Sequence, residues 1–169
     1  YAYSRQNLTM TDGFQTLSKP PQTQPVGPIE NLDSTYDTKW YGPWVGLDMA
    51  LKADEKLTLF AGLEYHWATY EGEADWNLIP RFAHPRSFVH DARGRGIRIS
   101  GGGEVVFSAP WSLGLEFVYQ DWSTEPGTDR LFFADGSTSV TRLNGVDWTS
   151  CAVMLKVTCR FDFGGRKTD

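Results

Sequence analysis

The feature that most constrains this sequence is a strict two-residue alternation between Trp111 and Gln120. The even positions are small or polar, and the odd positions are Trp111, Leu113, Leu115, Phe117 and Tyr119. This period is typical of a β-strand with one apolar face. In a soluble sandwich that face points into a shared core. In a transmembrane barrel it points at lipid, and aromatic residues mark both membrane interfaces.

The alternation recurs along the chain and predicts about six strands. They cover about residues 1–10, 35–52, 57–68, 95–108, 111–120 and 148–163. The clearest is Leu57 to Trp67, which a tight turn at residues 53–56 joins to the strand before it as a hairpin. Pro43 falls inside the second strand and weakens that prediction, because proline cannot donate to a ladder.

The connections between these strands alternate between long and short. Long, Pro- and Gly-containing loops are predicted at about 11–35, 71–94 and 123–144, within a β-barrel segment of residues 1–163 and before a polar tail at 164–169. Outer-membrane barrels have short periplasmic turns and long external loops. The strands that begin at Tyr1, Lys56 and Trp111 are therefore predicted to run outward.

Composition agrees with a membrane barrel. Aromatic residues make up 14% of the 169 residues, with seven Trp and 17 Gly. No run approaches the length of a transmembrane helix, and the net charge of −5 argues against a nucleic-acid partner. Cys151 and Cys159 would lie roughly 26 Å apart on one strand, too far to bridge. The chain begins at Tyr1 without a signal peptide, so a mature or trimmed product is expected.

The polar faces of the predicted strands carry charged residues of both signs. They are Asp48, Glu64, Glu104 and Glu116 against Arg98, Lys156 and Arg160, with His66 nearby. Charges in mid-strand are unfavourable in a dry core and natural in a polar lumen. We therefore predict an all-β, antiparallel, up-and-down transmembrane β-barrel in the outer membrane of a Gram-negative bacterium, with a lumen charge network. A soluble antiparallel sandwich or lipocalin-like barrel is the alternative.

One stretch and the order of strands resemble a known family. The stretch is Lys39-Trp40-Tyr41-Gly42-Pro43-Trp44-Val45-Gly46-Leu47, followed after a tight turn by Phe60-Ala61-Gly62-Leu63-Glu64-Tyr65-His66-Trp67. Together with the acidic loop and the terminal aromatic strand, it resembles the last six strands of the omptins. Omptins are ten-stranded outer-membrane endopeptidases, so the resemblance implies that about four N-terminal strands belong to the same barrel. Six strands alone would make a narrow closed barrel.

The resemblance also implies an Asp-x-His catalytic pair just beyond the strand that ends near Trp67. The matching stretch has Asp75 followed by Asn77, which cannot serve as a general base. His66 and Asp75 are the remaining weak catalytic candidates. His84, His90 and Asp91 match no tight metal site, and no cofactor or metal is predicted.

Arginines gather in the second long loop, at Arg81, Arg86, Arg93 and Arg95. Arginine binds phosphate well, so the sequence predicts contact with lipopolysaccharide there, and a solvated loop is the simpler alternative. The expected partners are outer-membrane lipid, lipopolysaccharide, and either a protein partner or further N-terminal strands that complete the barrel.

Three functions fit the sequence. The first is an outer-membrane barrel with a structural or interaction role and a filled, charged lumen, because inward-facing Trp residues would occupy the interior. The second is an omptin-type endopeptidase. The third is a pore for small solutes, which needs a lumen wide enough to conduct.

Overall fold

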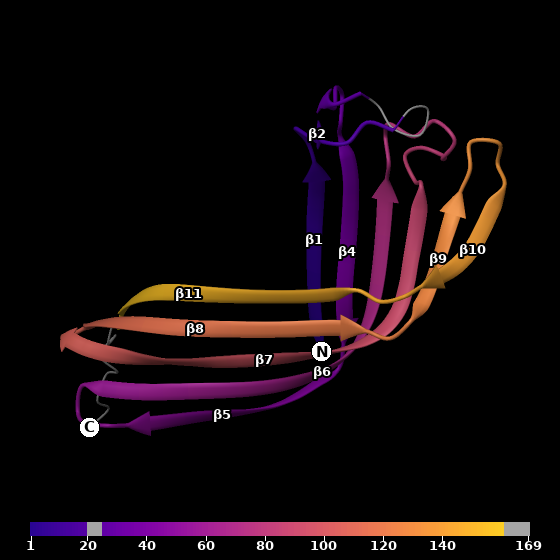
Figure 1. The fold of residues 1–169 in the computed structure, drawn as a ribbon. Helices are drawn as coiled ribbons and strands as arrows, with labels where there is room; N and C mark the ends of the chain where they lie inside the picture. The colour runs from indigo at the N-terminus through magenta and orange to yellow at the C-terminus, as the bar shows by residue number, and fades with distance from the viewer. Residues whose placement is uncertain (20–24, 161–169) are drawn as a thin grey trace, which may run out of the picture. The chain divides into compact units, whose positions relative to one another are not determined.

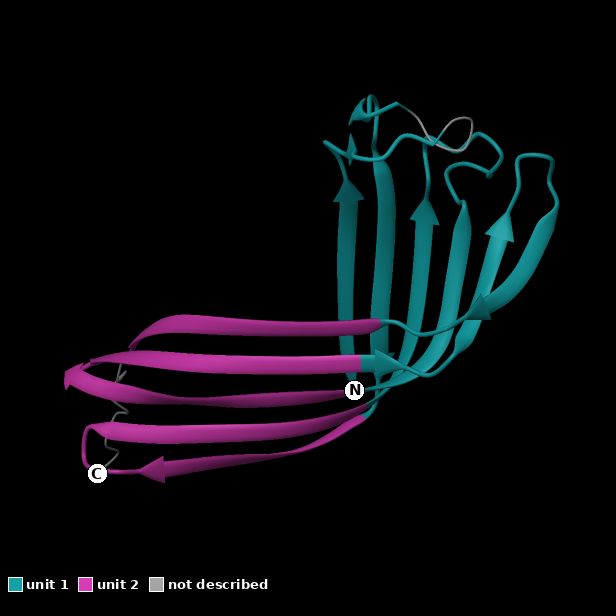
Figure 2. Cartoon of the chain, viewed as in Figure 1, with its two compact units in different colours: residues 1–43, 67–95, 123–146 teal, residues 44–66, 96–122, 147–169 magenta. Residues whose placement is uncertain are grey.

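The protein is an antiparallel all-β structure, seen in a computed structural model that describes residues 1–19 and 25–160. This confirms the predicted fold class. Within the described residues, no helix is long and apolar enough to cross a bilayer. The chain divides into two compact units (Figure 2): unit 1 holds residues 1–43, 67–95 and 123–146, and unit 2 holds residues 44–66, 96–122 and 147–169.

Unit 1 is a sheet with the strand order β1-β4-β6-β7-β9-β10 (Figure 1). Its strands are β1 (Ala2–Met10), β4 (Ser34–Gly42), the end of β6 (Leu57–Asp75), the start of β7 (Phe88–Ser108), β9 (Gly127–Phe132) and β10 (Thr138–Leu143). A separate two-stranded sheet joins β2 (Phe14–Gln15) and β3 (Gly27–Pro28) within the first long connection.

Unit 2 is a sheet with the strand order β5-β6-β7-β8-β11 (Figure 1). It contains β5 (Trp44–Lys52), the first part of β6, the second part of β7, β8 (Trp111–Thr124) and β11 (Asp147–Cys159). Neighbours along the chain are neighbours in the sheet from β5 to β8. This is the predicted up-and-down order.

Pro43 divides the second predicted strand into β4 and β5 without shifting its register on β6. Tyr41 lies opposite Thr69 before the break, and Trp44 lies opposite His66 after it. The Trp67 N–H donates to the Pro43 carbonyl at 3.0 Å, and proline has no N–H with which to return the bond. A Cβ on Gly42 would lie 1.9 Å from the Trp67 carbonyl oxygen, so this Gly-Pro step needs glycine.

Two predicted loops are shorter in the structure than in the sequence analysis. β6 continues to Asp75 and β7 begins at Phe88, so the connection predicted at about 71–94 spans 76–87. Residues 123–144, predicted as a loop, hold the β9–β10 hairpin, because β9 pairs with β7 from Phe88 to Asp91. The tail at 164–169, and the end of the last predicted strand at Phe161 and Phe163, lie outside the described residues.

Candidate functional site

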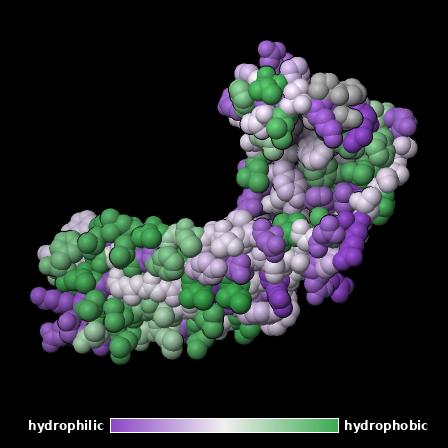
Figure 3. Space-filling model, viewed as in Figure 1, coloured by the Kyte–Doolittle hydropathy of each residue, from purple (hydrophilic) through white to green (hydrophobic). Residues whose placement is uncertain are grey.

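The odd-numbered side chains of unit 2 form an exposed apolar face. Leu47, Leu63, Leu115 and Leu155 are 62%, 54%, 56% and 71% exposed, so they do not pack into a core. The same face includes Val45, Met49, Leu51, Leu59, Ile97, Ile99, Val105, Phe107, Leu113, Phe117, Val153 and Val157. Figure 3 shows apolar side chains gathered over these strands. We call this surface the apolar face of unit 2.

The even-numbered side chains of unit 2 form the opposite face, which we call its polar face. Several of its side chains are buried: His66 on β6, Ser100 on β7, and Ser112 and Trp122 on β8. A water-soluble sheet buries apolar side chains and exposes polar ones. Unit 2 does the reverse, as expected of a strand surface whose apolar side meets lipid.

Arg98 joins three strands on the polar face of unit 2. From β7, its Nη1 donates to Glu64 Oε1 on β6 at 2.8 Å, and its Nη2 lies 3.7 Å from Glu116 Oε1 on β8. The three side chains are 20–28% exposed. Each predicted charge here has an opposite charge on the neighbouring strand, so no lone ion is left in a partly buried position.

Glu104 is the centre of a second charged group on the same face. One of its oxygens accepts from Ser112 Oγ at 2.6 Å and from Arg160 Nη2 at 3.0 Å. Lys156 lines a hollow of about 430 Å³ together with Glu104 and Glu116. Asp48 reaches across Gly62, where a Cβ would meet its carboxylate at 2.7 Å.

His66 is buried on this face, in an aromatic row. Its Nε2 lies 3.0 Å from Glu64 Oε2. Its ring centroid is 6.0 Å from that of Trp44 and 4.7 Å from that of Trp122. Gly96 makes the second contact possible, because a Cβ there would lie 2.4 Å from the Trp122 ring. His66 is thus held by Glu64, while the other weak catalytic candidate, Asp75, belongs to unit 1 and has other partners.

Asp75 pairs with a histidine that the sequence analysis did not assign to it. His84 Nδ1 lies 2.5 Å from Asp75 Oδ1, and Ser87 Oγ donates to the same oxygen at 3.4 Å. The Trp76 N–H donates to Ser87 Oγ at 2.9 Å, and Ser87 is fully buried. The sequence search looked for histidine two residues after an acid. It missed His84 because the 76–87 connection folds back on the end of β6.

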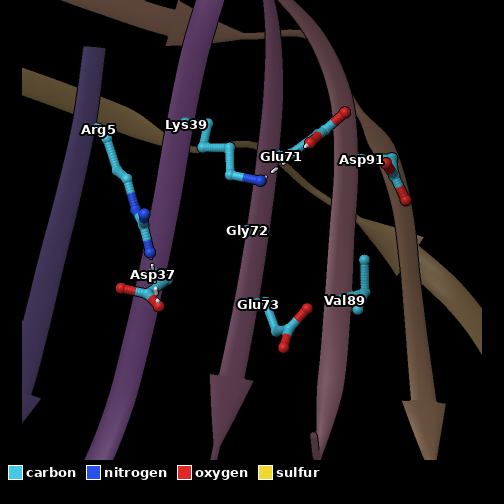
Figure 4. Close-up of a pocket in the computed structure, with 8 residues that line it drawn as sticks. All are labelled: Arg5, Asp37, Lys39, Glu71, Gly72, Glu73, Val89 and Asp91. Atoms are coloured by element: carbon cyan, nitrogen blue, oxygen red, sulfur yellow. Dashed lines mark hydrogen bonds and ion pairs between the residues drawn. The ribbon is translucent and has the colours of Figure 1, made fainter.

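On one face of unit 1, odd-numbered positions of β1, β4, β6 and β7 carry charged side chains. Ion pairs join Arg5 to Asp37 at 3.5 Å, Lys39 to Glu71 at 3.8 Å, and Arg86 to Glu73 at 2.7 Å. The strand residues of these pairs, with Val89 and Asp91, line a cavity of about 250 Å³ (Figure 4). We call this surface the charged face of unit 1.

Tyr41 marks one end of this charged face. Its hydroxyl donates to Glu71 Oε1 at 2.6 Å, which raises the pKa of Tyr41 to about 12. A carboxylate that accepts the phenolic proton favours the neutral phenol. Tyr41 thus stays a donor at any physiological pH and ties β4 to β6.

On the opposite face of unit 1, a hydrogen-bonded chain of three side chains joins β4, β6 and β7, and a carboxylate on β9 lies near one end of it. The Tyr36 hydroxyl bonds the Tyr70 hydroxyl, and it lies 2.9 Å from His90 Nδ1. His90 Nε2 lies 3.5 Å from Asp129. Burial lowers the pKa of His90 and raises the pKa of Tyr70, so both side chains favour their neutral forms.

In residues 1–19 and 25–160, no three His, Cys, Asp or Glu side chains come together as a group that could hold a metal ion. His84 and His90 each serve a different acid, Asp75 and Asp129.

The four arginines predicted to meet lipopolysaccharide have different surroundings. Arg81 lies with its guanidinium carbon 5.0 Å from the Phe82 ring centroid, and Arg86 pairs with Glu73. Arg93 and Arg95 are both exposed on β7, two residues apart and therefore on one face. Arg93 also lines a hollow with Thr69 and Glu125.

Comparison with known proteins assigns the chain to a family. No curated protein and no solved structure matches it. One family model, that of the Protochlamydia outer membrane protein, matches residues 1–161, nearly the whole chain. Protochlamydia is a Gram-negative bacterium, so the match confirms the predicted outer-membrane location, while the omptin resemblance stays a prediction. The chain belongs to Pom, the Protochlamydia outer membrane protein family.

Proposed function

We propose that the chain forms part of the wall of an outer-membrane β-barrel, and that the polar face of unit 2 lines a water-filled interior through which small polar solutes pass. The observation that carries this proposal is the arrangement of the wall charges. Glu64 and Glu116 share Arg98 on the strand between them, and Glu104 pairs with Arg160, the residue after β11.

The apolar face of unit 2 has the height of a membrane. On β6 it extends from Leu57 to Trp67, eleven residues that span roughly 36 Å along the strand. With a tilt of about 45° this corresponds to about 25 Å, the apolar band of outer-membrane barrels. Trp67 stands at one end of the face, and Phe107 and Trp111 at the other. The charged face of unit 1 cannot meet hydrocarbon and would lie beyond the membrane.

Glu64, Glu104 and Glu116 on the polar face have basic partners without a plug or an opposite wall. In a filled barrel, lumen charges find partners across the interior, whereas here Arg98 and Glu64 are satisfied side by side. The side chains of Glu64, Arg98, Glu104 and Glu116 keep 18–28% of their surface exposed. Water therefore reaches them, which suits a hydrated interior.

A filled barrel with a structural or interaction role is the second candidate, and the aromatic row supports it. His66 stands between Trp44 and Trp122, and the Trp122 ring centroid lies 6.4 Å from that of Trp148. These rings project from the polar face at one level and would narrow a small barrel there. The number of strands in the complete barrel decides between the two candidates.

Conductance separates them. The full-length protein, refolded in detergent and inserted into a planar bilayer, is expected to give stepwise currents that scale with KCl concentration. Arg98→Ala, which removes a wall cation, is expected to raise the preference for cations, while Arg86→Ala on unit 1 leaves it unchanged. If protein with a normal β-sheet spectrum and heat-resistant mobility gives no current, the pore is wrong and the filled barrel stands.

We propose outer-membrane lipid as the partner of the apolar face, and lipopolysaccharide phosphate as the partner of Arg93 and Arg95. Both arginines are exposed, and on β7 they come just before Ile97, where the apolar face begins. The double variant Arg93→Ala/Arg95→Ala is expected to bind lipopolysaccharide more weakly, and Arg86→Ala, whose partner is Glu73, serves as the matched control. Equal binding to dephosphorylated lipid A would contradict the phosphate contact.

A further inference from the structure

Unit 2 ends in two open edges, β5 on one side and β11 on the other. Within the described residues, β5 pairs only with β6, and β11 only with β8. The Trp67 N–H donates to the Pro43 carbonyl, so these two residues are a hydrogen-bonded pair of the ladder. Such pairs recur at every second residue, so on β5 the backbone groups of the odd-numbered residues bond β6. The backbone groups of the even-numbered residues of β5 therefore point to the open edge. These residues are Trp44, Gly46, Asp48, Ala50 and Lys52.

In the proposed barrel wall, on which this inference rests, the open edge lies in the part of the molecule that faces lipid. Val45, Leu47 and Met49 on β5 are 58–62% exposed and belong to the apolar face of unit 2. Hydrocarbon offers no hydrogen bonds, so membrane strands occur only in sheets whose edges are paired. An unpaired β5 would also be a template for wrong association. A further strand must cover it.

The direction of the strands excludes β11 and a second copy of the chain as that cover. Neighbouring strands in unit 2 alternate in direction, and β8 is antiparallel to β11, since Arg160 N–H donates to the Pro110 carbonyl while Thr149 bonds Asp121. β5 and β11 stand four steps apart and run the same way. If β5 paired with β11, or if either strand paired with an edge strand of a second copy rotated about the membrane normal, the two strands would be parallel. Bacterial outer-membrane barrels pair their strands antiparallel.

We propose that the strand covering β5 is the stretch of polypeptide that leads directly into β1. β1 is antiparallel to β4, with Ala2 opposite Gly42 and Tyr3 opposite Tyr41. β4 and β5 keep one register on β6 through Pro43, so the pairing can continue along β5. The residue before Tyr1 then lies opposite Trp44, and the fourth residue before Tyr1 lies opposite Leu47. This strand runs opposite to β5, as the sheet requires. The inference does not depend on whether the barrel conducts.

Cross-linking in the full-length natural protein tests the register. In a Cys151→Ser/Cys159→Ser background, Leu47→Cys is combined with a cysteine at the fourth residue before Tyr1. Oxidation in the outer membrane is expected to link most of the chains internally. The matched control moves the second cysteine by one residue, which turns its side chain to the other face, and is expected to link at least tenfold less.

Amide exchange gives a second readout that needs no substitution. In the natural full-length chain, the amides of Gly46, Asp48 and Ala50 are expected to exchange within about tenfold of those of Val45 and Leu47, which bond β6. Exchange a hundredfold faster would show an open edge and overturn the proposal. So would a disulfide-linked dimer of Leu47→Cys chains, or a Leu47→Cys cross-link to Val153→Cys on β11.

Discussion

Arg98 and Glu64 lie 2.8 Å apart on neighbouring strands of unit 2, and the same guanidinium reaches Glu116 on the strand beyond. One cation thus holds two carboxylates that would otherwise repel each other. Because the three side chains are partly exposed, solvent weakens their attraction. The group therefore contributes less to stability than an ion pair shielded from water.

Removal of the cation is the first prediction. Arg98→Ala is expected to lower the free energy of unfolding in detergent by about 1–2 kcal/mol, since it leaves two acids facing each other. Arg95→Ala, an exposed residue on the same strand, is expected to change it by under about 0.5 kcal/mol. Urea unfolding followed by tryptophan fluorescence measures both. If Arg98→Ala/Glu64→Gln is no more stable than Arg98→Ala, the repulsion is not the cause.

The two faces of β5 should tolerate charge differently. Leu47→Arg places a cation on the apolar face and is expected to destabilise the protein in a bilayer by about 2–4 kcal/mol. Ala50→Arg on the same strand points to the polar face and is expected to have a much smaller effect. Reversible unfolding from lipid vesicles compares them. Equal effects would mean that the odd-numbered face does not meet lipid.

The alternation along β6 explains both what the sequence predicted and what it did not. From Leu57 to Trp67 the apolar side chains are odd-numbered, and this pattern predicted the strand and its exposed face correctly. From Ala68 onward the phase reverses: Tyr70 and Ala74 are buried, whereas Glu71 and Glu73 line the charged face. A strand that passed from lipid to water would show this change. A prediction that assumes one constant phase ends the strand too early.

Contacts at the candidate site were predictable only where strand pairing sets them. Glu64 and Arg98 are on one face of adjacent strands, so their pairing followed from the pattern. Asp75 and His84 meet because a twelve-residue connection folds back, and no period in the sequence records that. The row through His66 depends on Gly96, whose missing side chain lets Trp122 reach across β7.

His90 gives unit 1 a predicted pH dependence. Burial lowers the pKa of His90 below its ordinary value of about 6.5, so the unfolded chain binds a proton more readily than the folded one. Stability is therefore full above the unfolded pKa and falls as the pH drops from about 6.5 toward the folded pKa. Amides of β7 and β9 are expected to exchange faster at pH 5 than at pH 7, after correction for intrinsic rates.

His90→Gln is the matched variant for this effect. It cannot take up a proton, so its β7 and β9 amides are expected to show no such difference between pH 5 and pH 7. Asp91 and Asp129 both raise the His90 pKa and so oppose the effect of burial. Asp129→Asn should therefore lower the folded pKa further and extend the loss of stability to lower pH. A pH dependence that persists unchanged in His90→Gln would assign it to another group.

Gly96→Ala tests the aromatic row. The added Cβ would lie 2.4 Å from the Trp122 ring, which must move away from His66, at a cost of about 1–3 kcal/mol. Near-ultraviolet circular dichroism is expected to lose intensity. Gly101→Ala on the same strand is the control, because its nearest contact would be 3.7 Å. Matching spectra for the two variants would show that Trp122 does not depend on Gly96.

The last prediction concerns peptide hydrolysis, for which the Asp75–His84 pair at the end of β6 is a candidate base. We expect no turnover, because Ser87 also donates to the Asp75 oxygen that His84 contacts, and because the pair ties the 76–87 connection to β6. His84→Ala is therefore expected to speed proteolytic nicking of that connection severalfold, with Arg86→Ala as the neighbouring control. A fluorogenic dibasic peptide, offered to the full-length protein with lipopolysaccharide, tests the activity directly. Cleavage that disappears in both His84→Ala and Asp75→Asn, but persists in His66→Ala, would make the pair catalytic and the chain a peptidase.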